Sequence, residues 1–164
     1  MALLTYVPSQ VSVTVAGLFD IEGFVDGTFV EITKEVPPYQ YQSGMDGQTS
    51  RTITNDTNYS VVLTLAQTSK SNNLLSNLHA VDLATQLGKV PLLIRDKSGS
   101  TTFFSPSAWV ESSPVLGFSN NMEPRVWTLK CTQGVLRVGG AGDASLIDSL
   151  MAGLPTLSNI LGGS

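Results

Sequence analysis

The chain has 164 residues, of which 41% are apolar and only 13% are charged, and its net charge is −4. This length suffices for one hydrophobic core, so we expect a single domain over residues 1–164. The charged fraction is about half that of an ordinary soluble domain, which indicates that partner molecules cover part of the surface. The 9 basic residues are scattered along the chain, which excludes a basic patch that grips phosphates.

Cysteine usage and hydropathy exclude further classes of protein. Cys131 is the only cysteine, so neither an intramolecular disulfide nor a thiolate zinc cluster can form, and we expect a small buried apolar side chain. The first residues lack the basic flank and the long apolar stretch of a secretory signal, and no uncharged apolar run has the length of a membrane span. We therefore expect a protein that is made in the cytoplasm and has no contact with a membrane.

Two β-strands are predicted in the first part of the chain. Residues 10–16 alternate, with Val11, Val13 and Val15 on one face, which is the pattern of a half-buried strand that ends at Gly17. A second strand is predicted over residues 27–36. The pair Pro37-Pro38 ends it, because proline has no N–H to donate to a sheet.

Residues 37–50 form a long connection without helical periodicity. Gly44 and the pair Asp46-Gly47 suit a tight turn, so we interpret this stretch as an extended hairpin arm with its tip near Met45. Tyr39 and Tyr41 favour an arm that docks against another surface over a loop that folds back onto its own sheet.

The next segment switches from strand to helix. Strand character covers residues 51–67 and is strongest over residues 59–65. Four apolar residues then form one stripe of an amphipathic helix over residues 71–86, namely Leu74, Leu75, Leu78 and Val81. Ser69, Ser71 or Asn72 is expected to cap its start, and Gly88 is placed where a left-handed residue ends a helix.

More strands and a second helix are predicted in the last part of the chain. Residues 89–96 and 101–110 are expected to form a hairpin, and residues 125–132 and 135–139 two further strands with Gly134 at the turn between them. Trp109 and Trp127 lie in strands and are expected in the core or at a subunit interface. A short helix is predicted over residues 143–154, followed by an uncharged end, residues 155–164, that either docks on a partner or stays disordered.

Residues suited to catalysis are sparse. His79 is the only histidine, and Asp82, three residues later on the predicted helix, is its nearest carboxylate, so we expect a structural histidine. The glycine-rich residues 139–142 lack the Gly-Lys-Ser/Thr of a phosphate-binding loop. We therefore predict no catalytic residues, no metal site and no cofactor.

Five segments resemble phage tail tube proteins, the structural subunits of contractile-tailed phages, which are similar to the tube subunits of secretion systems. They are FVDGTFVEITKE at 24–35, GMDGQTSRT at 44–52, QTSKSNNLLSNL at 67–78, PLLIRDKSGST at 91–101, and the strands that contain the two tryptophans. The resemblance implies a mainly β fold, a small β-barrel or sandwich with one flanking amphipathic α-helix.

The resemblance also implies an assembly. Six copies would close into a ring, and the rings would stack into a hollow tail tube within the virion that conducts DNA without binding it specifically. Sheath and baseplate proteins are further expected partners. For contacts between rings we predict Tyr39, Tyr41, Met45 and Asp46. For the acidic wall of the lumen the candidates are Asp26, Glu31 and Asp56, with Asp20 and Glu111 also considered.

Other functions remain open at this point. Within structural proteins, the alternatives are a secretion-tube subunit, a tail terminator and a baseplate component. A β-barrel module that binds a ligand among its aromatic residues is an alternative of another class, and a hydrolase built around His79 and Asp82 is a third.

Overall fold

The structure is a computed structural model in which residues 3–140 are described. The predicted helix at 143–154 and the apolar end at 155–164 lie outside these residues. The elements are, in chain order, a 3-10 helix η1 (Pro8–Gln10), β1 (Val11–Val15), β2 (Phe19–Asp20), β3 (Val30–Lys34), β4 (Tyr39–Ser43), β5 (Thr49–Ile53), β6 (Tyr59–Leu65), α1 (Ser71–Thr85), β7 (Val90–Asp96), β8 (Thr102–Ser112), β9 (Arg125–Thr132) and β10 (Val135–Arg137).

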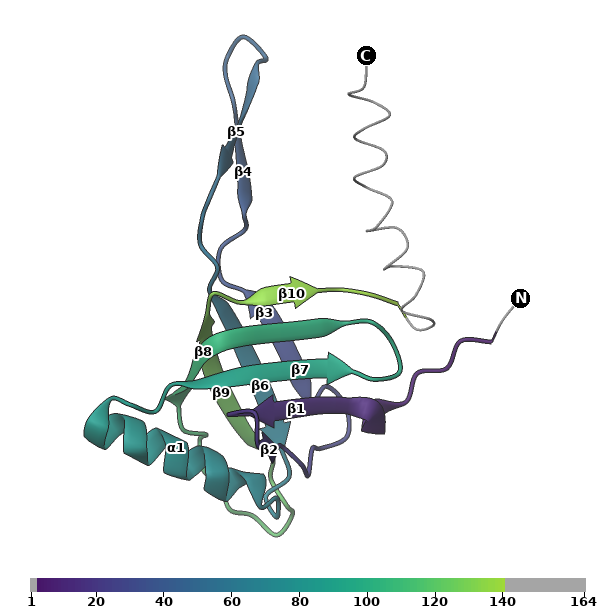
Figure 1. Ribbon diagram of the computed structural model, residues 1–164, viewed down its shortest axis with the longest axis vertical. Coiled ribbons are helices and arrows are strands. Elements are labelled where there is room, and N and C mark those ends of the chain that lie inside the picture. The colour runs from purple at the N-terminus through teal and green to yellow at the C-terminus, as the bar shows by residue number, and fades with distance from the viewer. Residues whose placement is uncertain (1–2, 141–164) are drawn as a thin grey trace.

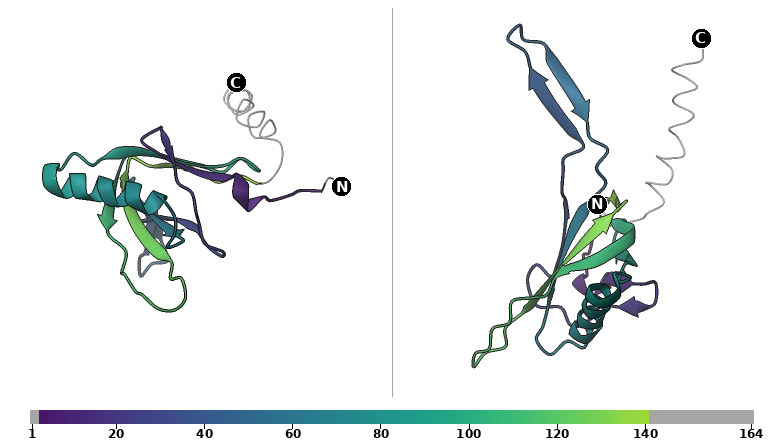
Figure 2. Two further views of the ribbon diagram at one scale, coloured as in Figure 1. Left: turned by 90° about the horizontal axis from the view of Figure 1, so that it is seen from below. Right: turned by 90° about the vertical axis from the view of Figure 1, so that its left-hand side faces the viewer.

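One antiparallel sheet makes up the body of the molecule. Its strands follow the order β2-β1-β7-β8-β9-β6-β3, and β10 pairs with β8 beside this path. The sheet bends so that β1, β7 and β8 cross over β9, β6 and β3, with α1 at one end (Figures 1 and 2). The bend lies in β8. Its residues 102–105 pair with β7 and β10, and its residues 107–112 pair with β9, with Ala108 also opposite Val90 of β7.

The bent sheet does not close into a complete barrel. Among the described residues, β1 and β3 face each other across the open side but do not pair. Strand β3 has a free edge there, while β1 pairs with β2 at Thr14 and Val15 and is open only over its first residues. Residues 21–25 close one end of this side: the Ile21 N–H donates to the Val13 carbonyl oxygen (2.8 Å), and the Val25 N–H donates to the Thr64 carbonyl oxygen (3.3 Å). The other end of the open side remains unpaired.

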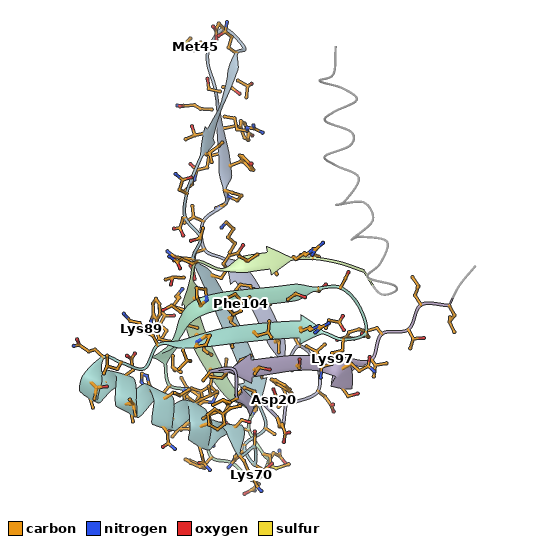
Figure 3. All side chains as sticks on the ribbon, in the orientation of Figure 1. Asp20, Met45, Lys70, Lys89, Lys97 and Phe104 are labelled. Atoms are coloured by element: carbon orange, nitrogen blue, oxygen red, sulfur yellow. The ribbon has the colours of Figure 1, made fainter. Side chains whose placement is uncertain are left out.

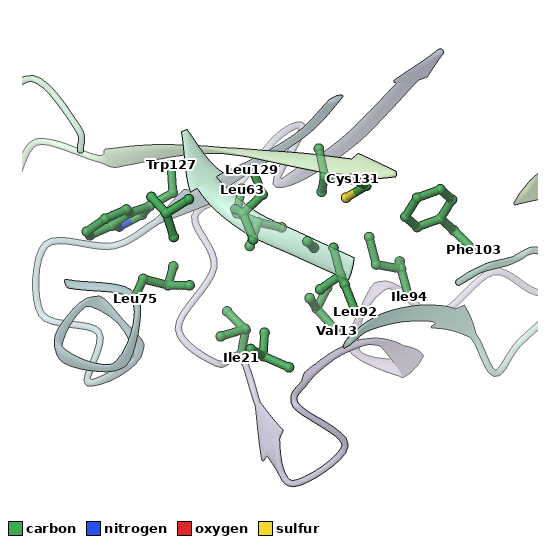
Figure 4. Packing of buried hydrophobic residues seen from close by; sticks show 14 of the residues in the cluster. Val13, Ile21, Leu63, Leu75, Leu92, Ile94, Phe103, Trp127, Leu129 and Cys131 are labelled. Carbon is green, nitrogen blue, oxygen red and sulfur yellow. The ribbon is translucent and has the colours of Figure 1, made fainter. Parts of the chain in front are cut away.

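Alternation along the strands builds the core. In β6 the residues Tyr59, Val61, Leu63 and Leu65 are buried while the residues between them are not. The same alternation in β9 and β8 places Leu129 and Phe103 in the same cluster, with Trp127 and Phe103 toward its two ends (Figure 4). This arrangement confirms the mainly β fold with one flanking helix.

Helix α1 packs its apolar stripe against the sheet. Leu75 is fully buried, and Leu74 and Leu78 pack against the core. Val81, which the sequence assigns to the same stripe, is 49% exposed, because the helix extends past the edge of the body (Figure 1). The N-cap of the helix is Lys70, without a capping side-chain hydrogen bond, and not one of the predicted residues Ser69, Ser71 or Asn72. The Ser69 hydroxyl accepts a hydrogen bond from the Ser71 N–H (3.2 Å) just before the helix.

Three local predictions need correction. The helix ends at Gln86, whose φ is +60°, and not at Gly88, which is a glycine because a side chain there would collide with Asp82. The strand predicted over residues 51–67 is two strands, since its first residues belong to the arm and β6 begins only at Tyr59. Strand β10 pairs with β8 and not with β9, so Gly134 does not close a hairpin.

Candidate assembly surfaces

The arm is a two-stranded hairpin that extends away from the body (Figure 1). Strands β4 and β5 pair only with each other, from Tyr39 opposite Ile53 to Ser43 opposite Thr49. At the tip the Gly44 N–H donates to the Gln48 carbonyl oxygen (2.8 Å), and Gly47 adopts the positive φ of +82° that the turn requires. The hairpin and its tip near Met45 are as predicted, although the arm continues to Ile53 and not only to residue 50.

The two faces of the arm differ in chemistry. One face has Tyr39, Tyr41, Arg51 and Ile53, and the Arg51 guanidinium lies 4.7 Å from the centre of the Tyr39 ring. The other face has glutamine, serine and threonine side chains. Tyr41 is 79% exposed and the side chain of Met45 is fully exposed. An isolated hairpin is marginally stable in water, and an aromatic face without a core to cover it is typical of a docking surface.

The four predicted contact residues Tyr39, Tyr41, Met45 and Asp46 thus all lie on this arm. The Asp46 carboxylate accepts a hydrogen bond from the Gln48 N–H (3.2 Å) and helps to shape the tip. Sequence reasoning missed Ile53 and Arg51. The sequence contains a signal for them. If residues 39–53 form a hairpin with its tip near Met45, then Ile53 and Arg51 lie opposite Tyr39 and Tyr41 and on the same face.

A groove lies at the end of the molecule opposite to the arm. It has a volume of about 450 Å³ between α1 and the connection of residues 113–124 that joins β8 to β9. Its apolar lining includes Leu116, Phe118 and Trp127, and its polar lining includes Asn72 and Ser76 of α1. Figure 1 shows the arm and this connection at the two ends of the long axis, and Figure 3 shows Met45 and Lys70 at those ends.

The rim of this groove is apolar and exposed. Four side chains of the connection are more than half exposed: Val115 (94%), Leu116 (62%), Phe118 (78%) and Met122 (73%). Buried Arg125 holds the connection in place, because its guanidinium donates to the Gly117 carbonyl oxygen (3.2 Å) and lies 5.2 Å from the centre of the Phe118 ring. The groove therefore has a wall that Arg125 holds in a defined conformation. The sequence did not predict this groove.

The outer face of β3, β6, β9 and the end of β8 is a second exposed surface. Glu31 lies opposite Val62 in the sheet, on the face that points away from the core. On the same face Lys130 of β9 forms an ion pair with Glu35 and lies 3.8 Å from the Glu111 carboxylate. The hydrogen bond that Lys130 donates to Glu35, together with the nearby charge of Glu111, raises the pKa of Lys130 and outweighs its desolvation. The described part of this face therefore has more carboxylates than cations.

The predicted lumen candidates do not share one surface. Glu31 lies on the outer sheet face together with Glu111. Asp26 is exposed in the connection that contacts the Thr64 end of β6, while Asp56 precedes the opposite end of that strand. Asp20 in β2 accepts a hydrogen bond from the Thr14 hydroxyl (2.7 Å). Sequence reasoning missed Glu35 and Lys130, because only the register across β6 shows that they meet.

The two tryptophans occupy different positions. Trp127 is buried, and its Nε1–H donates to the side-chain oxygen of Asn72 (2.9 Å), which joins β9 to α1. Trp109 is half-buried and lies opposite Lys130 in the sheet, on the outer face. Trp127 is therefore a core residue, which is one of the two predicted alternatives, core or subunit interface.

The pair His79 and Asp82 is not arranged for proton transfer. The Asp82 carboxylate accepts from the Gly88 N–H (3.1 Å), while the buried Nδ1 atom of His79 has no hydrogen-bond partner among residues 3–140. Cys131 is fully buried, as predicted, and burial raises the pKa of its thiol to about 12. Within residues 3–140, no three His, Cys, Asp or Glu side chains gather as a metal site would need. The one helix in that range is too short and too polar to cross a membrane.

The chain is similar in sequence to a phage structural protein. The chain is 31% identical over 143 residues to "Structural protein ORF10" of Pseudomonas phage KPP10, a match that covers 83% of each chain. No protein-family model matches the chain.

Solved structures share the fold. A chain of the anti-feeding prophage cap, described as the AFP tube terminating cap, matches with a TM-score of 0.54 at 14% identity over 84% of this chain and 94% of its own. A chain of the PVC sheath–tube complex, an extracellular contractile injection system in its extended state, matches with the same TM-score at 15% identity over 82% and 92%. These likenesses and the viral relative confirm the resemblance to tail tube proteins, and the chain belongs to a family of phage structural proteins.

Proposed function

We propose that six copies of this protein close into a ring and that the rings stack into a hollow tail tube, which conducts the genome during infection. The protein has a structural and not an enzymatic role in the tail of the virion, after its synthesis in the host cytoplasm, and sheath and baseplate proteins are its neighbours. One observation carries the proposal: an arm with an exposed aromatic face lies at one end of the molecule, and an apolar groove lies at the other.

Stacking follows from this arrangement. A surface at one end that fits a different surface at the other end gives a head-to-tail contact, which repeats along an axis without limit. The arm of one copy binds the groove between α1 and residues 113–124 of a copy in the next ring. Asp46 at the tip and Lys70 at the opposite end of the molecule add complementary charge.

Ring closure uses the sheet edges. Strand β3 has a free edge, and unpaired edges favour pairing with another chain. Pairing of this edge with the sheet of a neighbour extends the surface of β3, β6, β9 and β8 around the ring and turns its outer face toward the lumen. On that face Glu35 and Glu111 neutralise Lys130, so the wall repels DNA phosphates and lets the genome slide.

Negative-stain electron microscopy of the purified chain across a concentration series tests the proposal. The unaltered protein is expected to form hollow filaments. Deletion of residues 43–48 leaves rings or folded monomers without stacking. A sharper pair of variants divides the arm by face: Tyr39→Ser with Tyr41→Ser is expected to abolish stacking, while Gln40→Ser with Gln42→Ser preserves it. A monomer of about 17 kDa at high concentration would contradict the proposal and favour a ligand-binding module.

A terminator or cap is the second candidate, because one of the similar structures is described as a tube-terminating cap. A terminator has to stop the stacking that a tube subunit propagates. The same micrographs separate the two functions, since isolated rings that never stack, even at high concentration, indicate the terminator.

A further inference from the structure

The open side of the bent sheet contains an apolar cleft. It lies between the first residue of β1 and the free edge of β3, has a volume of about 390 Å³ and reaches Ile94 and Phe103 of the buried core. Val30 and Ile32 line one wall, and Val11 lines the other. A second cleft of about 590 Å³ shares Tyr6, Val11, Gly27 and Phe29 with the first, so the two form one groove along the open side.

The described part of the chain ends at the rim of this cleft. Thr101, which lines the cleft, donates its hydroxyl proton to the Gly139 carbonyl oxygen (3.0 Å) and accepts from the Gly139 N–H (3.1 Å). The Ser100 N–H then donates to the Gly140 carbonyl oxygen (3.2 Å). Residues 141–164 therefore begin beside the opening of an apolar groove.

The sequence of this segment suits such a groove. Asp143 and Asp148 are its only charged residues. Five apolar residues follow the spacing of one helical face: Leu146, Ile147, Leu150, Met151 and Leu154. Burial of an apolar stripe of this kind against an apolar surface is favourable, and the groove opens beside its attachment point.

We propose that the stripe of residues 146–154 packs into the cleft between β1 and β3 of its own chain and completes the core on the open side. We expect the segment to bind the cleft of its own chain and not that of another copy, because its attachment at the rim gives it a high effective concentration there. The inference does not depend on the tube. Since the β3 edge proposed for ring closure borders this cleft, the segment has to leave that edge when neighbouring subunits join.

A cross-link in the full chain tests the proposal. In a Cys131→Ala background, one cysteine replaces Val30 in the cleft wall and another replaces Leu150 in the stripe. After oxidation of a dilute solution, mass spectrometry of the digested protein is expected to show the link within one chain. The control pair, with cysteines at Leu116 and Leu150, is expected to remain unlinked because Leu116 lines the groove at the arm-distal end. Links between chains only, or equal linking of the two pairs, would overturn the proposal.

A second measurement uses a single charge in the stripe. Leu150→Asp is expected to raise the fluorescence of an apolar dye such as ANS several-fold and to speed amide exchange in β3, because the cleft becomes exposed. Ser149→Asp places the same charge next to the stripe and is expected to change neither. Unchanged dye binding and exchange for Leu150→Asp would contradict the docking, whether or not the protein forms tubes.

Discussion

Lys130 on β9 and Glu35, which follows β3, form an ion pair across the strand that separates them, β6. Glu111 lies 3.8 Å from the same ammonium group on its other side. The two carboxylates occupy the donors that a lysine would otherwise offer to a phosphate. On the proposed tube wall, this arrangement leaves the Lys130 ammonium unavailable to DNA phosphates.

Removal of both carboxylates is expected to turn this wall into a DNA-binding surface. Glu35→Gln with Glu111→Gln frees Lys130 and removes two negative charges from the face. Retention of labelled duplex DNA by the assembled protein is expected to rise and to weaken again with added salt. Glu22→Gln is the control, since Glu22 is an exposed carboxylate outside this face. Equal retention by all three proteins would show that the face does not line the lumen.

Charge reversal at the two ends of the molecule tests the stacking contact. Asp46→Lys and Lys70→Glu are each expected to lower the amount of filament at low salt, and the two changes together are expected to restore it. Filament mass is measured by sedimentation across a salt series. Asp46→Asn is the control, because it keeps an oxygen for the turn hydrogen bond but loses the charge. If the double reversal does not recover filaments, the arm binds elsewhere on the next ring.

Gly23 is expected to be intolerant of any side chain. Its φ is +76°, and an added Cβ atom would lie 2.7 Å from the Cβ atom of Ser69. Ser69 cannot easily move away, because its hydroxyl donates a hydrogen bond to the Glu22 carbonyl oxygen (2.5 Å). Gly23→Ala is expected to lower the free energy of unfolding by about 2 kcal/mol or more. Gly17→Ala, at a similar φ of +69° but in open space, is expected to cost about 1 kcal/mol. Urea denaturation of both variants measures the difference, and equal losses would mean that the contact with Ser69 is unimportant.

The Cys131 thiol is expected to stay protonated in the folded protein well above neutral pH. Burial raises its pKa from 9.0 to about 12, so the unfolded chain loses this proton first. The contribution of the thiol to stability is present in full below pH 9 and declines as the pH rises from there toward 12. Comparison of urea unfolding with Cys131→Ala across this range isolates the effect.

The same burial predicts poor reactivity of Cys131. At pH 8 a thiol reagent such as DTNB is expected to label the native protein far more slowly than the urea-unfolded protein. Rapid labelling of the native protein would contradict the buried position.

Much of the fold follows from local pattern. The patterns of residues 10–16 and 125–132 predict strands that the structure contains with nearly the same bounds, because each strand buries side chains in alternation. The hairpin arm follows from its glycines and the Asp46-Gly47 pair. Helix α1 follows from Leu74, Leu75 and Leu78, while its exact end does not, since Gln86 gives no sequence signal for a left-handed conformation.

Residue type and spacing along the chain account for most strands, the helix, the scarcity of charge and the arm with Tyr39, Tyr41, Met45 and Asp46. The pairing of β10 with β8, the contact of Lys130 with Glu35, and the separation of Glu31 from Asp26 and Asp56 appear only in the folded chain. The groove beside α1, opposite to the arm, likewise appears only there. The physical reason is that pairing between strands distant in sequence depends on how the whole sheet bends, and no local pattern encodes that bend.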